Sequence, residues 1–225
     1  MDEEAARTKQ AQAAMLQAEY RQRQRLELAA ALLLLWGRPR KQSIQELLAA
    51  AIREGTIVAY RAGVREGLRD VALFSSRTAQ PVELVQSRPD EVLIRRRAKG
   101  AARNYADSYL KRLDGKRETV RLWGQRAAAR EAIGEEAYRL SRIAATETPQ
   151  FFNEARRETI RQSLRRSGVD EALIVRVWNA QLDACPHCWA LDGQSTPLNE
   201  PYSSGEEPGA VHPFCRCVEV LRIVH

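Results

Sequence analysis

The stretch that decides the fold lies near the C-terminus, where residues 172–180 (ALIVRVWNA) are followed by CPHC at 185–188 and HPFCRC at 212–217. The β-branched and aromatic residues of 172–180 predict a strand, and residues 217–224 (CVEVLRIV) predict a second one. This C-terminal segment carries all four cysteines, two of the three histidines and five of the nine prolines. Because it is too short and too rich in turns to build a core alone, something else must hold it together.

Five cysteine and histidine side chains of this segment are candidate metal ligands. Cys185 and Cys188 form one pair, His212 and Cys215 repeat its two-residue spacing, and Cys217 follows two positions later. Two tight pairs of sulfur or nitrogen donors separated by a loop are typical of structural zinc sites, which take four ligands. We favour the first four as the ligand set, with Cys217 as the substitute for His212 or Cys215.

Two other uses of the cysteines compete with a structural metal. Four cysteines allow three disulfide connectivities, but the sequence shows no export signal and reducing conditions are expected. A redox CxxC motif of the thioredoxin type begins a helix, whereas Asp192-Gly193 and Pro197 argue for turns here. Zinc deaminases place a His-x-Glu pair before their cysteines, and no such pair exists in this chain. We therefore predict a structural zinc ion and a protein that is not an enzyme.

The first 170 residues contain only four prolines and predict helices almost throughout. We expect helices over 2–36, from a capping box at Ser43 and Glu46, and over 56–70, followed by a loop at 74–90. Further helices are expected over 90–113, 116–148 and 150–166, the first two being separated by Asp114-Gly115. The predicted fold class is therefore α+β, with a mostly helical N-terminal portion and a small zinc-stapled antiparallel β module at the C-terminus. We divide it into a variable helical region, 1–130, and a C-terminal domain, 131–225.

Positive charge is concentrated in the helical portion. The net charge is +7, and residues 91–130 hold 12 basic and 4 acidic residues. A basic segment indicates a polyanionic partner, most often nucleic acid, although charge runs on helices are also commonly solvated faces. The longest apolar run, nine residues at 28–36, is too short to span a membrane, so no membrane partner is expected. The candidate nucleic-acid contacts are Arg95, Arg96, Arg97, Lys99 and Arg103.

An ordered series of motifs resembles the Mu F-like phage head-morphogenesis family over roughly residues 135–220. The series is RIAATET (142–148), a helix with an aromatic-Asn pair, VWNAQLDACPHCWALDGQ (177–194) and HPFCRC (212–217). The chain departs from the family pattern where only Ala184 separates Asp183 from Cys185, and where residues 209–211 (GAV) replace the common Pro-Pro-Leu. The matching positions are Thr146, Glu147, Trp178, Asp183, Cys185, Cys188, Asp192, Gly193, His212, Pro213, Cys215, Arg216 and Cys217.

The resemblance implies a minor capsid or head-morphogenesis protein of a tailed phage or related particle. Such a protein is present in few copies near the portal and assists head assembly and the packaging or delivery of DNA. Its implied partners are the portal protein, capsid or scaffold subunits, and double-stranded DNA bound without sequence specificity; no small-molecule substrate is implied. Its implied location is the head interior or portal region of the virion, and the host cytoplasm during assembly. The alternative is a zinc-ribbon-like nucleic-acid-binding protein.

Several motif residues outside the ligand set have structural interpretations. The helix periodicity turns Glu147 inward, where a carboxylate needs a partner, and Arg216 between two cysteines is the candidate. Trp178 is expected in the core against the metal loop, and Asp192 with Gly193 predicts a turn.

Overall fold

The computed structural model describes residues 41–78, 80–123, 135, 138, 149–212 and 215–224, without the side chains of residue 113 and residues 116–123. The expected helix over 2–36, residues 124–148 of the expected helix 116–148 except 135 and 138, and the residues Pro213 and Phe214 lie outside these ranges, and Glu147 is among the residues outside them. The described residues form two compact units, one of 58–78, 80–89, 149–212 and 215–224 and one of 41–57, 90–123, 135 and 138. The division proposed between residues 130 and 131 stays a prediction. Among the described helices, none combines the length and apolar composition needed to cross a membrane.

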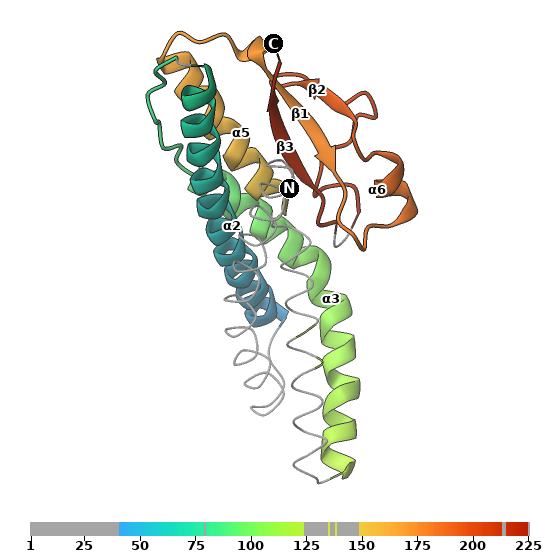
Figure 1. Ribbon diagram of the computed structural model, residues 1–225. Helices are drawn as coiled ribbons and strands as arrows, with labels where there is room; N and C mark the ends of the chain where they lie inside the picture. The colour runs from blue at the N-terminus through green and yellow to red at the C-terminus, as the bar shows by residue number, and fades with distance from the viewer. Residues whose placement is uncertain are drawn as a thin grey trace. The chain divides into compact units, whose positions relative to one another are not determined.

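Helix α2 runs without interruption from Lys41 to Thr78 (Figure 1). The prediction of two separate helices and of a loop beginning at residue 74 was therefore wrong. Glycine lowers helix propensity by only about 1 kcal/mol, and tertiary packing compensates for it here. A Cβ at Gly63 would lie 2.2 Å from the carbonyl oxygen of Phe152, and one at Gly67 would lie 2.7 Å from that of Arg156. These glycines allow the second part of α2 to approach helix α5 closely.

Helix α3 extends from Glu91 to Trp123, and Asp90 caps it by accepting a hydrogen bond from the backbone N–H of Leu93 (2.9 Å). The expected interruption at Asp114-Gly115 was wrong, because the helix continues through both residues. One face is buried at four-residue intervals, as an amphipathic helix requires, and consists of Ile94, Ala98, Ala102 and Ala106.

Helix α5 spans Pro149–Arg166, which confirms the predicted helix over 150–166. Proline is favoured in the first turn of a helix, where its missing N–H has no partner to lose. The helix ends in a turn in which Gly168 has a φ of +66° and Val169 N–H donates to the carbonyl of Leu164 (3.0 Å).

The C-terminal sheet has three antiparallel strands in the order β2-β1-β3, preceded by the short 3-10 helix η1 (Glu171–Leu173). Strand β1 (Ile174–Asn179) pairs with β2 (Ser195–Pro197) and with β3 (Val218–Ile223). The two predicted strands are thus present, whereas β2, only three residues long, was not predicted. The sheet packs on the helices of its own unit through a buried cluster of Val71, Phe74, Ile160, Leu164, Ile174, Leu198 and Leu221. The predicted α+β class, mostly helical with a small antiparallel sheet near the C-terminus, is confirmed.

Candidate metal centre

The CPHC motif forms the start of a single helical turn, α6 (Pro186–Ala190). Cys185 is the N-cap of this turn, and its sulfur accepts a hydrogen bond from the backbone N–H of Cys188 (3.4 Å). The expectation of turns without a helix at this motif was therefore wrong. The turn-forming residues Asp192, Gly193 and Pro197 all lie beyond Ala190, where α6 ends, so they do not prevent the helix from forming. The consequence is that both thiols lie on the same side of one turn.

The Asp192-Gly193 turn returns the chain from α6 to the sheet. The carboxylate of Asp192 accepts a hydrogen bond from the backbone N–H of Ala180 (2.7 Å). Gly193 has a φ of +78°, a conformation that favours glycine, and its N–H donates to the carbonyl of Trp178 (2.9 Å). The turn thereby fixes α6 against the end of β1.

Helix α5 anchors the segment that carries the remaining donors. The side-chain amide of Asn153, which is buried, donates to the carbonyls of Pro208 (2.8 Å) and Cys217 (3.4 Å), and its oxygen accepts from the N–H of Glu219 (3.4 Å). Gly209 has a φ of +83°, and a Cβ there would lie 2.8 Å from the Cβ of Pro149. These contacts fix the backbone on both sides of the HPFCRC motif.

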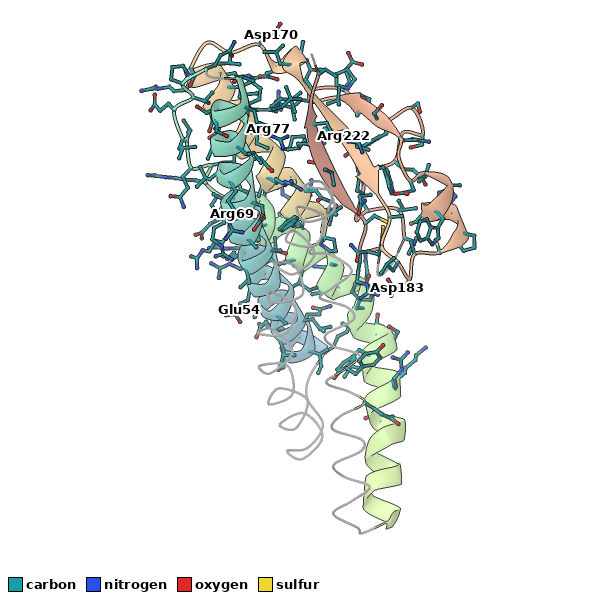
Figure 2. All side chains as sticks on the ribbon, in the orientation of Figure 1. Glu54, Arg69, Arg77, Asp170, Asp183 and Arg222 are labelled. Carbon is teal, nitrogen blue, oxygen red and sulfur yellow. The ribbon has the colours of Figure 1, made fainter. Side chains whose placement is uncertain are left out.

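The structure brings all five candidate ligands together in two overlapping groups. Cys185, Cys188 and His212 form one group, Cys188, Cys215 and Cys217 form the other, and the donor atoms within each lie within 4.8 Å of one another. Asp183 is in the same loop region as the sulfur atoms, which are yellow in Figure 2.

Three donor–donor distances in the cluster are close to the edges of a tetrahedral site. The sulfur atoms of Cys188 and Cys215 are 3.8 Å apart, and a tetrahedron with zinc–sulfur bonds of about 2.3 Å has a sulfur–sulfur edge of about 3.8 Å. The Nε2 atom of His212 is 3.3 Å from the sulfur of Cys185 and 3.2 Å from that of Cys188, against a sulfur–nitrogen edge of about 3.5 Å. The four favoured donors do not form a single group within 4.8 Å, so Cys215 must move closer to Cys185 or His212 before all four can bind one ion.

The same distances exclude a disulfide in this structure. All four cysteines are free thiols, and the 3.8 Å between Cys188 and Cys215 sulfurs far exceeds a disulfide bond length of about 2.05 Å.

Hydrogen bonding distinguishes Cys217 from the other thiols. A hydrogen bond between the two side chains lowers the pKa of Cys215 to about 5 and raises that of Cys217. The lowered pKa of Cys215 favours its thiolate, which is the form that binds metal. Burial, followed by the charge of Cys215, raises the pKa of Cys188 to about 12. A bound cation would offset this cost, because it stabilises thiolates strongly.

Of the other motif residues, Trp178 is buried and packs edge-to-face on Tyr202, with ring centroids 5.3 Å apart. Arg216 forms an ion pair with Asp183, whereas its expected partner, Glu147, lies outside the described residues. Asp183 is the position at which the chain departs from the family pattern, because only one residue separates it from Cys185. In the structure its carboxylate pairs with Arg216, the arginine between Cys215 and Cys217. His187 lies away from the cluster and pairs with Glu206 (2.8 Å).

The sequence analysis missed a buried ionic network beside the metal cluster. Arg176 on β1 donates to Glu207 (2.8 Å) and to Glu219 on β3 (3.1 Å), and its guanidinium lies 4.7 Å from the centre of the Tyr202 ring. Arg156 on α5 donates to the backbone carbonyl of Glu219 (2.5 Å). The sequence did contain a signal for this network: Arg176 and Glu219 each interrupt an apolar strand, IVRVWN and VEVLRI. A buried charge requires a partner, so the two residues could have been predicted to pair.

Arg95, Arg96, Arg97, Lys99 and Arg103 all lie on α3, in the other unit, and their side chains are exposed. Comparisons of the chain with family models, with curated proteins and with solved structures find no match.

Proposed function

We propose that the chain is a structural minor capsid or head-morphogenesis protein of a tailed phage or related particle, whose C-terminal module is held together by one zinc ion. In this role the module is a stable domain that docks near the portal, and the helical part of the chain contacts DNA and neighbouring subunits. The observation that carries the proposal is the Cys/His cluster, which gathers donors from two loops of a motif series that resembles the Mu F-like family.

Zinc is the ion that this donor set fits best. Thiolate and imidazole groups in a tetrahedral arrangement favour zinc over the hard cations that prefer oxygen ligands. The ligands are Cys185, Cys188, His212 and Cys215, with Cys217 donating a hydrogen bond to Cys215 from outside the coordination sphere. Zinc supplies a cross-link between α6 and the HPFCRC segment when it is bound, and its binding free energy adds directly to that of folding.

Burial supports a structural role for the metal over a catalytic one. A catalytic zinc ion keeps one coordination position open to substrate. Here the side chains of Cys188 and Cys215 are 1% and 2% exposed, and Cys217 beside them is 1% exposed. The donors are also more numerous than four, so protein groups can fill every position.

The experiment that tests the particle assignment is mass spectrometry of purified particles. The proposal predicts that the chain is present in a low, fixed ratio to the portal protein. A chain that lacks residues 1–36 should keep its zinc but fail to enter heads, because residues 2–25 have helix propensity without a continuous apolar stripe and gain burial only with a partner.

Glu147→Gln serves as the matched variant, because a structural role predicts that this protein still enters particles when its fold is intact. Absence of the chain from particles would contradict the proposal. Normal incorporation of the truncated chain would contradict the role given to residues 1–36.

The zinc-ribbon alternative locates nucleic-acid binding on the metal module itself. From residue 171 onward the chain has three basic and seven acidic residues, which opposes binding of a polyanion there. The candidate basic residues Arg95, Arg96, Arg97, Lys99 and Arg103 lie instead on α3, so we favour the structural role for the module.

A further inference from the structure

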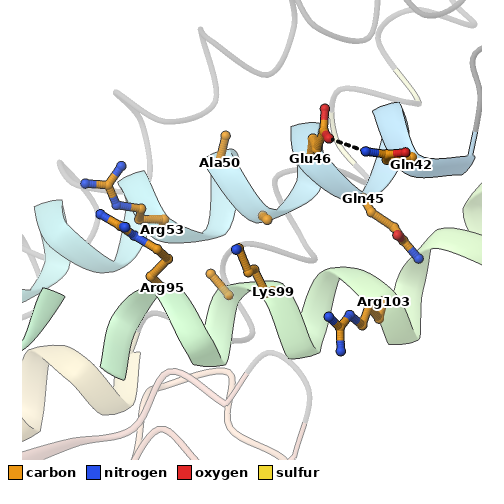
Figure 3. A pocket seen from close by; sticks show the side chains of 10 residues that line it. Gln42, Gln45, Glu46, Ala50, Arg53, Arg95, Lys99 and Arg103 are labelled. Carbon is orange, nitrogen blue, oxygen red and sulfur yellow. Dashed lines mark hydrogen bonds between the residues drawn. The ribbon is translucent and has the colours of Figure 1, made fainter. Parts of the chain in front are cut away.

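A groove lined by basic side chains runs between two helices of the second unit. It has a volume of about 430 Å³ and lies between residues 42–53 of α2 and residues 95–103 of α3 (Figure 3). Its cationic lining consists of Arg53 from α2 and Arg95, Lys99 and Arg103 from α3. Figure 3 shows Arg53 and Arg95 at one end, with Lys99 and Arg103 further along α3.

The charges of this groove have few partners within the described residues. Arg53 makes a long ion pair with Glu91 (3.4 Å), and its buried Nε atom has no hydrogen-bond partner there. Arg95, Lys99 and Arg103 have no acidic partner in the part of the chain that the structure describes. The acidic residue of the lining, Glu46, accepts a hydrogen bond from Gln42 (3.0 Å). The groove therefore carries an excess of positive charge.

The spacing of the three α3 residues makes this excess costly without an anion. Residues 95, 99 and 103 follow one another at four-residue intervals, so they lie about 6 Å apart along one helix face. Like charges at this spacing destabilise a helix. A row of anionic groups at a similar spacing would reverse the sign of the interaction, and consecutive phosphates of a nucleic-acid strand form such a row.

We infer that this groove binds the phosphodiester backbone of nucleic acid, with Arg53, Arg95, Lys99 and Arg103 as the phosphate contacts. The inference deepens the DNA contact of the proposed function and rests on it for the choice of nucleic acid as the polyanion. It differs from the sequence prediction in two respects. It adds Arg53 from a second helix, and it leaves out Arg96 and Arg97, which do not line the groove.

The walls explain why phosphate contacts, and not base contacts, are expected. The long side chains of the lining are mostly cationic, and Ala49, Ala50 and Ala98, which also line it, have no polar group that could read a base edge. Binding should therefore be independent of sequence and strongly dependent on salt, because it releases counterions from the phosphates.

The test measures binding of the full-length chain to a fluorescein-labelled 20-base-pair duplex by anisotropy at several salt concentrations. The triple variant Arg95→Gln, Lys99→Gln and Arg103→Gln should bind at least tenfold more weakly. The slope of log K against log salt should fall in magnitude by about 3, since each lost phosphate contact removes about 0.9.

A matched control removes the same charge from the same helix outside the groove, through Arg96→Gln, Lys111→Gln and Arg112→Gln. These side chains are exposed and do not line the groove. Glutamine preserves helix propensity in both variants, and circular dichroism checks the fold. The control should change the slope by less than 1. Equal losses in the two triple variants, or a wild-type chain that does not bind the duplex at low salt, would overturn the inference.

Inorganic tripolyphosphate distinguishes a nucleic-acid strand from a short phosphate chain. It should displace the duplex only at concentrations far above those at which unlabelled duplex does so. Displacement at equal phosphate concentration would overturn the assignment to nucleic acid. Failure here is separable from failure of the proposed function, because zinc content and incorporation into particles are measured on the same variants and neither reports on the duplex.

Discussion

The close crossing of α2 and α5 provides a quantitative prediction, because a methyl group added at Gly63 has no room. Its Cβ would lie 2.2 Å from the carbonyl oxygen of Phe152 and 3.0 Å from the Cβ of Ala155. The first obstacle is a backbone atom, so relief requires the two helices to separate. Overpacking of this kind costs about 3 kcal/mol, and the better helix propensity of alanine returns about 1 kcal/mol. We therefore expect Gly63→Ala to lower the free energy of unfolding by about 2 kcal/mol.

Gly100→Ala is the matched control, since Gly100 is also inside a helix and a Cβ there meets nothing within 4 Å. Only the difference in helix propensity between glycine and alanine remains, so the free energy of unfolding of this variant should rise by about 1 kcal/mol. Urea unfolding followed by circular dichroism measures both changes. The two glycine-to-alanine substitutions should therefore change the free energy of unfolding in opposite directions. A Gly63→Ala protein as stable as wild type would show that α2 and α5 do not approach each other as closely as the structure indicates.

Two further predictions concern the buried ionic network. Arg176→Leu removes the 3.1 Å guanidinium contact of Glu219, which is 0% exposed, and leaves its carboxylate only the 4.0 Å contact with Arg157. The change should cost about 3 kcal/mol in urea unfolding, and adding Glu219→Leu should recover most of this loss. Equal stability of the single and double variants would refute the pairing. Burial alone would raise the pKa of Glu207, but the hydrogen bond from Arg176 and the charge of Arg157 hold it below the ordinary value of 4.5. The carboxylate thus stabilises the fold above pH 4.5, and this contribution is lost as the pH falls through the lowered pKa. Urea midpoints measured down to about pH 3.5 should therefore fall less steeply for Glu207→Gln than for wild type, and identical slopes would contradict this.

The fold class could be predicted from the sequence because its strongest signals are local. A β-branched run at 172–180 and a proline-poor helical region gave the two halves, and helix α5 was predicted almost to the residue. The predicted breaks before residue 56 and at Asp114-Gly115 were wrong, because α2 and α3 continue through them, and one glycine costs a helix only about 1 kcal/mol. Strand β2 is too short to produce a pattern of its own and exists only through pairing with β1.

The candidate site was predictable in composition but not in geometry. The spacing of Cys185, Cys188, His212 and Cys215 was enough to name candidate donors, and the structure brings them together with Cys217 in two groups that could hold a metal ion. The role of Cys217 depends on a hydrogen bond with Cys215, which sequence spacing does not distinguish from coordination. Asn153, which holds the second motif from α5, is separated from it by about 60 residues, and only the fold brings them together.

The central claim is that the Cys/His cluster holds one structural zinc ion. X-ray absorption at the zinc edge, on protein purified under reducing conditions and assayed for metal content, tests it most directly. The account predicts one equivalent of zinc with three sulfur ligands at about 2.3 Å and one nitrogen ligand at about 2.0–2.1 Å. Cys217→Ser should leave this spectrum unchanged, and Cys188→Ser should lose the metal. A protein that carries no metal and keeps its fold would contradict the claim.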